Sequence, residues 1–127
     1  MNRNPSTNIL TFAATVELGA GLVVAIAPAL AIALLLGVQG SSADIVLGRC
    51  FGIAIFALGV ACWPVRQRNG GTPPGLRALL VYNALVALCL GYAATSEHLH
   101  APLLWPAIAL HGSMALLLVW AWRVGRS

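Results

Sequence analysis

Apolar residues fill four long stretches of this sequence, and polar residues are concentrated in the segments between them. The stretches are 8–36, 45–65, 76–95 and 101–122. At a helical rise of about 1.5 Å per residue, each is long enough to cross the roughly 30 Å hydrocarbon core of a bilayer. The pattern predicts an all-α fold, an integral membrane bundle of four transmembrane helices that forms a single domain over residues 1–127.

Proline and polar residues indicate where these helices bend or end. The first stretch is longer than one span needs, and Pro28 lies inside it. Because proline lacks an N–H and its ring clashes with the preceding turn, we expect a break there and an apolar helical continuation to Leu36. Residues 37–42 predict a turn, and the polar segment 66–75 predicts a loop outside lipid. Pro102 is expected in the first turn of the last helix, where a missing N–H costs little.

Composition indicates that the surface of the protein faces lipid. Only 8% of the residues are charged and 60% are hydrophobic, whereas a soluble domain carries about 25% charged residues. The lipid bilayer is therefore an expected partner, together with other membrane protein subunits or a second copy of this chain. The arginines lie singly or in pairs at the ends of apolar stretches, so no nucleic-acid partner is expected. The cysteines, Cys50, Cys62 and Cys89, are expected to be free, buried and inert.

The arginines also predict an orientation, because cytoplasmic ends of membrane helices carry an excess of basic residues. With both termini in the cytoplasm, Arg49 is the one basic residue outside. The other six are inside: Arg3, Arg66, Arg68, Arg77, Arg123 and Arg126. We therefore expect cytoplasmic N and C termini. All seven basic residues are arginine, a bias that suggests a GC-rich bacterial genome and a multi-pass protein of the bacterial inner membrane.

The second stretch carries a packing signal. Gly48, Gly52 and Gly59 fall on one side of a helix with a period of 3.6 residues. Small residues let transmembrane helices approach closely, so these three define a helix-packing groove. The favoured interpretation is that another helix of the same chain fills the groove, and dimerisation through it is the alternative.

Strongly polar side chains inside the apolar stretches need an explanation, because a central charge costs about 2.5–3.5 kcal/mol on insertion scales. Glu17, Asn83 and His111 fall at similar depths, each on the small-residue side of its helix. We predict that they meet in the bundle interior with Tyr82 beside them, as an intramembrane polar cluster. The favoured interpretation is that they only hold the helices in register. The alternative is a proton-linked or ligand-binding site.

A second polar group is expected near the outer surface. Arg49 lies there, and Asp44, Glu97 and His98 should be close to it. We expect an outer-interface cluster of ion pairs that joins two loops, with an anion or lipid-headgroup contact as the alternative.

His98 and His100 form a His-x-His pair, which makes them weak candidates for a metal site. A closed site needs more ligands, and the remaining histidine, His111, lies deeper in the bilayer. Haem ligation by two histidines would need both at one depth, which this spacing does not supply. No metal site is therefore predicted, and the sequence requires no cofactor.

Four spans, inside termini and a glutamate in the first span, Glu17, resemble the small multidrug-resistance exporters. The resemblance covers topology and Glu17 only, and it implies a small proton-coupled transporter that acts as a dimer through Glu17.

Three functions follow from these observations. The favoured one is an accessory or structural subunit that packs against a larger membrane complex, because the chain has a packing groove and short loops. The second is the dimeric transporter. The third is a haem- or quinone-associated redox membrane protein, suggested by the histidines and Trp105. No nucleophile lies near a base and an orienting group, so an enzyme is not expected.

Overall fold

Five α-helices make up the part of the chain that the computed structural model describes, residues 5–64 and 74–124. They are α1 Pro5–Ile26, α2 Pro28–Leu36, α3 Ser42–Ala61, α4 Pro74–Ser96 and α5 Leu104–Val124. Four of them, α1, α3, α4 and α5, are long and apolar enough to cross a membrane. The predicted all-α bundle with four membrane-spanning helices is therefore confirmed. Of the predicted loop over 66–75, residues 66–73 lie outside the described residues, and Pro74 and Gly75 belong to the first turn of α4 instead. Four of the arginines also lie outside the described residues: Arg3, Arg66, Arg68 and Arg126.

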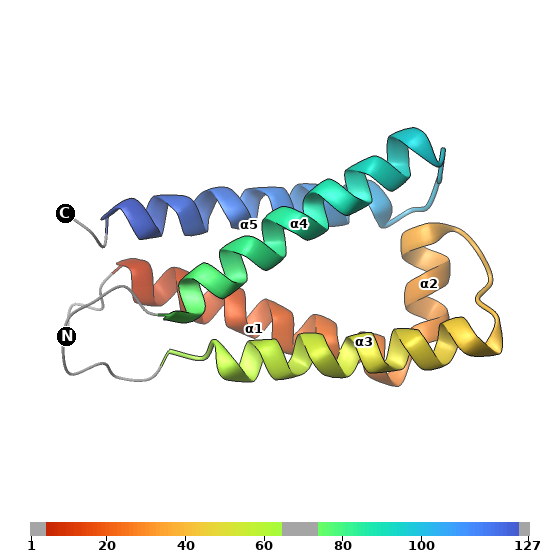
Figure 1. Cartoon of the computed structure of the whole chain (residues 1–127), viewed down its shortest axis with the longest axis horizontal. Coiled ribbons are helices and arrows are strands. Elements are labelled where there is room, and N and C mark those ends of the chain that lie inside the picture. Colours follow the sequence, from red (N-terminus) through yellow and green to blue (C-terminus); the bar gives the residue numbers. More distant parts are fainter. Residues whose placement is uncertain (1–4, 65–73, 125–127) are drawn as a thin grey trace.

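The first apolar stretch divides at Ala27, which leaves the helical conformation with φ −124° and ψ 57°. Pro28 then begins α2, at a position where no N–H partner is needed. As a result α2 turns away from α1 and stands across the long helices (Figure 1). It ends at Gly37, whose left-handed φ of 72° is a conformation that glycine adopts without a Cβ clash. The N–H of Gly37 bonds to Ala33 O and so caps the helix.

Local hydrogen bonds and prolines explain where the later helices begin. A capping box starts α3: the Ser41 side chain accepts from Asp44 N, and the Asp44 carboxylate accepts from Ser41 N at 2.8 Å. The expectation that Pro102 lies in the first turn of the last helix is wrong. α5 starts at Leu104, and Pro102 lies in the turn that precedes it. Pro106 occupies the first turn instead.

The helices associate mainly as two pairs, α1 with α3 and α4 with α5. α1 and α3 approach so closely that a Cβ on Gly21 would lie 2.8 Å from Gly52 O. A Cβ on Gly59 would lie 2.8 Å from Leu18 Cγ, and one on Gly48 would lie 3.1 Å from Pro28 Cβ. The groove of Gly48, Gly52 and Gly59 is therefore filled by α1 and the start of α2 from the same chain.

The buried apolar core lies where α1, α4 and α5 meet, together with Cys62 just after α3. Its residues are Leu10, Ala13, Ala14, Cys62, Leu76, Leu79, Met114, Leu118 and Ala121. Large apolar side chains also cover the outside of the bundle; Leu88 is 70% exposed and Leu116 is 73% exposed. So many exposed large apolar side chains would be unfavourable in water and suit contact with lipid tails.

The start of α1 and the end of α5 lie at one end of the bundle, whereas α2 and the α4–α5 connection lie at the other (Figure 1). Which end faces the cytoplasm stays a prediction. Among the described arginines, Arg77 and Arg123 are near the end where α1 starts and α5 ends, and Arg49 is in the half of α3 towards the other end. The arginine distribution therefore favours cytoplasmic termini.

Cysteine labelling tests this orientation. In a variant without native cysteines, we expect Ser96→Cys to react with a membrane-impermeant maleimide in intact bacterial expression cells. Ser127→Cys should react only after the cells are permeabilised. The reverse pattern of labelling would show that the chain is inserted the other way round.

Candidate functional site

Three polar side chains from three helices form a hydrogen-bonded chain in the bundle interior. Asn83 Nδ2 on α4 donates to Glu17 Oε1 on α1 at 3.0 Å. His111 Nδ1 on α5 lies 2.8 Å from Asn83 Oδ1. Tyr82 packs edge-to-face on His111, with ring centroids 5.9 Å apart. The structure therefore brings together all four residues of the intramembrane polar cluster.

This cluster is deep in the bundle and well covered by protein. Glu17 and Asn83 are each 1% exposed, and His111 and Tyr82 are half-buried. At about 1.5 Å per residue, Glu17, Asn83 and His111 each lie at least about 10 Å from both ends of their helices. Polar groups at such depth in a membrane protein need partners within the protein, which the hydrogen bonds partly provide.

The backbone of α4 fixes the direction of these hydrogen bonds. Asn83 Nδ2 also donates to Leu79 O at 3.0 Å. A backbone carbonyl can only accept, so the amide nitrogen must face Leu79 and Glu17, and Oδ1 must face His111. Since Oδ1 is also only an acceptor, the proton between the two side chains belongs to His111 Nδ1. All side-chain donors therefore point the same way, from His111 through Asn83 to Glu17.

At each end of this series of hydrogen bonds, polar atoms remain that form no hydrogen bond within the described residues. Glu17 Oε2 is buried without a hydrogen-bond partner among the described residues. Within the same residues, neither His111 Nε2 nor the Tyr82 hydroxyl forms a hydrogen bond. Buried polar atoms are nearly always paired, so groups that lack a partner next to a cavity are candidates for ligand contact.

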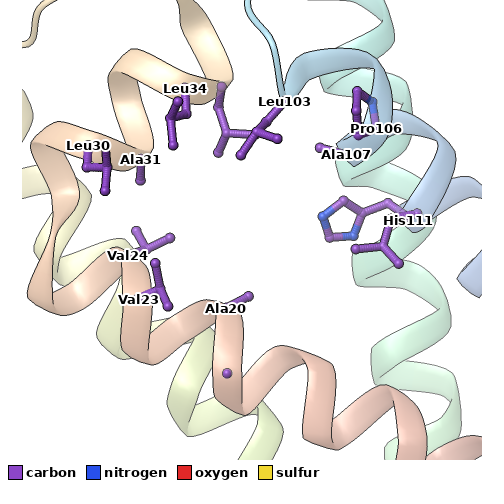
Figure 2. A pocket seen from close by; sticks show the side chains of 13 residues that line it. Ala20, Val23, Val24, Leu30, Ala31, Leu34, Leu103, Pro106, Ala107 and His111 are labelled. Atoms are coloured by element: carbon purple, nitrogen blue, oxygen red, sulfur yellow. The ribbon is translucent and has the colours of Figure 1, made fainter.

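Two adjoining cavities lie beside the polar cluster. One, of about 310 Å³, is lined by Glu17, Tyr82 and His111 together with apolar residues from all five helices. The other, of about 390 Å³, lies between α1, α2 and α5, and His111 is the one polar side chain among its lining residues. Figure 2 shows the His111 ring directed into this second cavity, facing α1 and α2 across it. Five residues line both cavities: Ala20, Val24, Leu35, Ala107 and His111.

The shape of these cavities follows from the placement of α2. The α4–α5 connection is joined to α2 by a hydrogen bond from Leu103 N to Leu34 O, 3.0 Å long. α2 therefore bridges α1 and α5 at the end of the bundle opposite the start of α1 (Figure 1). The larger cavity lies between this bridge, α1 and α5, and its volume falls in the range of about 300–1,000 Å³ that is typical of small-molecule sites.

No protein-family model, curated protein or solved structure matches this chain. The candidate site is therefore interpreted from its own residues. Sequence reasoning placed the polar cluster but not the cavities; the signal that could have pointed to them is an apolar stretch that exceeds one span and contains Pro28.

The four residues of the outer-interface cluster, in contrast, form no ion pairs with one another in the described structure. The carboxylate of Asp44 is engaged by Ser41 in the capping box. Arg49 Nε donates to Ala25 O at 3.2 Å. Ala25 is in the last turn of α1, where carbonyls lack helical partners and a guanidinium is favourable. Glu97 and His98 are exposed beyond the end of α4.

The remaining candidates lie apart from the cavities, with one exception. His98 and His100 are exposed, and the described residues contain no group of three or more potential metal-binding side chains. All three cysteines are free, but only Cys62 is buried, so the expectation of burial fails for Cys50 and Cys89. Both are on membrane-spanning helices, and Cys89 lines the cavity beside Glu17.

Proposed function

We propose that this small membrane protein binds a lipid-soluble molecule with one polar end in the cavities between its helices. The observation that carries the proposal is a buried carboxylate oxygen without a hydrogen-bond partner among the described residues, Glu17 Oε2, beside an apolar cavity. The half-buried His111, whose hydrogen bond within the described part of the chain uses Nδ1 only, lines both cavities. A network that served only to hold helices in register would be expected to satisfy its own members. A mostly apolar pocket with a few convergent polar groups is the usual form of a small-molecule site.

The alternatives suggested by the sequence receive less support. A dimeric transporter that works through Glu17 needs this carboxyl at a subunit interface, whereas Glu17 is 1% exposed within a single chain. An accessory subunit would use the outer faces of the bundle, so this role is compatible with ligand binding. The role of an accessory subunit does not explain why the buried Glu17 Oε2 lacks a hydrogen-bond partner among the described residues. A quinone-associated protein is one special case of the proposal, since a quinol has an apolar tail and a polar ring.

Titration with 4-heptylphenol tests the proposal. This probe has a single polar group and an apolar body of suitable size. We expect saturable binding to the protein in detergent micelles, measured by isothermal titration calorimetry at a fixed detergent concentration. Ala107 lines both cavities, so Ala107→Phe should fill the shared space and lower the affinity at least about tenfold.

The matched control is Ala109→Phe, which adds the same side chain to an exposed position of α5 that lines neither cavity. It should bind the probe as the wild type does. Absence of saturable binding to the wild type, or equal binding by Ala107→Phe, would remove the proposed function.

A further inference from the structure

We infer that the polar end of the ligand is a hydroxyl group that donates its hydrogen bond to His111 Nε2, as a lipid-soluble phenol or alcohol can. This inference rests on the proposed function and names the chemical class of its ligand. It follows from the direction of the hydrogen bonds around Asn83 and from the position of the imidazole at the cavity.

The first step is the tautomer of His111. Leu79 O and Glu17 Oε1 both accept from Asn83 Nδ2, so Asn83 cannot present its amide protons to His111 without losing both bonds. His111 Nδ1 therefore donates to Asn83 Oδ1 across 2.8 Å. A charged ring is costly among apolar walls, and the neutral ring with its proton on Nδ1 has a lone pair on Nε2. The ring thus offers an acceptor to the cavity.

The second step is the effect of Glu17 on that acceptor. The bonds from His111 to Asn83 and from Asn83 to Glu17 run head to tail. Hydrogen bonds in such a chain polarise one another and become stronger in surroundings of low dielectric constant. A donor at Nε2 would extend the chain by one more bond in the same direction. Glu17 is therefore a positioning residue that acts on the ligand through Asn83 and His111.

The third step is discrimination between polar groups. A ketone or an ether would place its lone pairs against the lone pair of Nε2 and leave a buried acceptor unpaired. A hydroxyl donates to Nε2 and so leaves this acceptor paired. Leaving one buried polar group unpaired typically weakens binding by about tenfold or more.

The test compares 4-heptylphenol with its methyl ether, 4-heptylanisole, which has the same body but no donor. Affinities are measured in detergent micelles for the wild type and for His111→Phe. The same titrations with Ala107→Phe, whose cavities are filled, show how much of each signal comes from partition of the probe into the micelle. We expect the wild type to bind the phenol at least about tenfold more tightly than the ether. His111→Phe keeps a ring against Tyr82 but lacks the acceptor, so its preference should fall to nearly equal affinities.

Nitrogen NMR of histidine-labelled protein gives a second readout that does not depend on the variant folding. Before ligand is added, His111 should show a protonated Nδ1 and an unprotonated Nε2, and the phenol but not the ether should shift the Nε2 signal. Equal binding of phenol and ether by the wild type, a preference that persists in His111→Phe, or a protonated Nε2 would each overturn the inference. In the first two cases saturable binding itself would leave the proposed function standing, whereas absence of binding by either probe would remove that function.

Discussion

Replacing Gly21 with alanine is expected to destabilise the protein by about 3 kcal/mol, at the upper end of what overpacking normally costs. The new Cβ would lie 2.8 Å from Gly52 O and 2.8 Å from Phe56 Cα. These are backbone atoms of α3, and they cannot rotate away as a flexible side chain can. The two helices would have to separate along the most extensive contact in the bundle. Unfolding in mixed micelles with increasing sodium dodecyl sulfate, followed by circular dichroism, measures the loss.

Gly19 provides the matched control on the same helix, since a Cβ there would meet nothing within 4 Å. Alanine is a better helix former than glycine by up to about 1 kcal/mol, so Gly19→Ala should be neutral or slightly stabilising. If both variants lost stability equally, the loss would belong to glycine itself and not to the α1–α3 contact. Wild-type stability of Gly21→Ala would contradict the close approach of these helices.

The membrane-spanning helices could be predicted from the sequence because lipid contact imposes a requirement on every residue of a span. Long uncharged stretches satisfy it, and few other structures do. Pro28 likewise indicated a break, since its effect on the backbone is local. The direction that α2 takes after the break could not be predicted. It depends on contacts with α3 and on the hydrogen bond between Leu103 and Leu34, which are distant in sequence.

The same distinction applies to the site. The depth of a residue in the bilayer can be counted along a helix, and similar depths of Glu17, Asn83 and His111 were enough to suggest that they meet. The cavities result from how the helix pairs spread apart next to α2 (Figure 1). The over-long apolar stretch with Pro28 indicates the extra helix, but the distance between the pairs depends on contacts that are far apart in sequence. The outer-interface cluster was expected from proximity alone. Instead, the backbone N–H and the hydroxyl of Ser41, three residues earlier, donate hydrogen bonds to the Asp44 carboxylate.

Asn83→Leu is expected to cost about 2 kcal/mol of stability, although leucine and asparagine have the same branched shape and the same number of non-hydrogen side-chain atoms. Interhelical hydrogen bonds in membrane proteins contribute about 0.6 kcal/mol on average, and buried groups left unpaired add about 1–3 kcal/mol. Asn83 holds Glu17 Oε1 and His111 Nδ1 at once, so its loss leaves a buried acceptor and a half-buried donor without partners. Unfolding in sodium dodecyl sulfate measures this loss as well.

A second substitution separates the lost hydrogen bonds from the unpaired groups they leave. In the double variant Glu17→Leu and Asn83→Leu, the carboxyl that needed a partner is gone, and apolar contacts replace it. We therefore expect the double variant to be more stable than Asn83→Leu alone, because removing both partners is cheaper than removing one. If the loss of stability in the double variant equalled the sum of the losses in Glu17→Leu alone and Asn83→Leu alone, the two residues would be energetically independent. The carboxyl could then not act on His111 through the amide. The same double variant should fold but bind 4-heptylphenol more weakly, since His111 Nδ1 would no longer be held as a donor to Asn83.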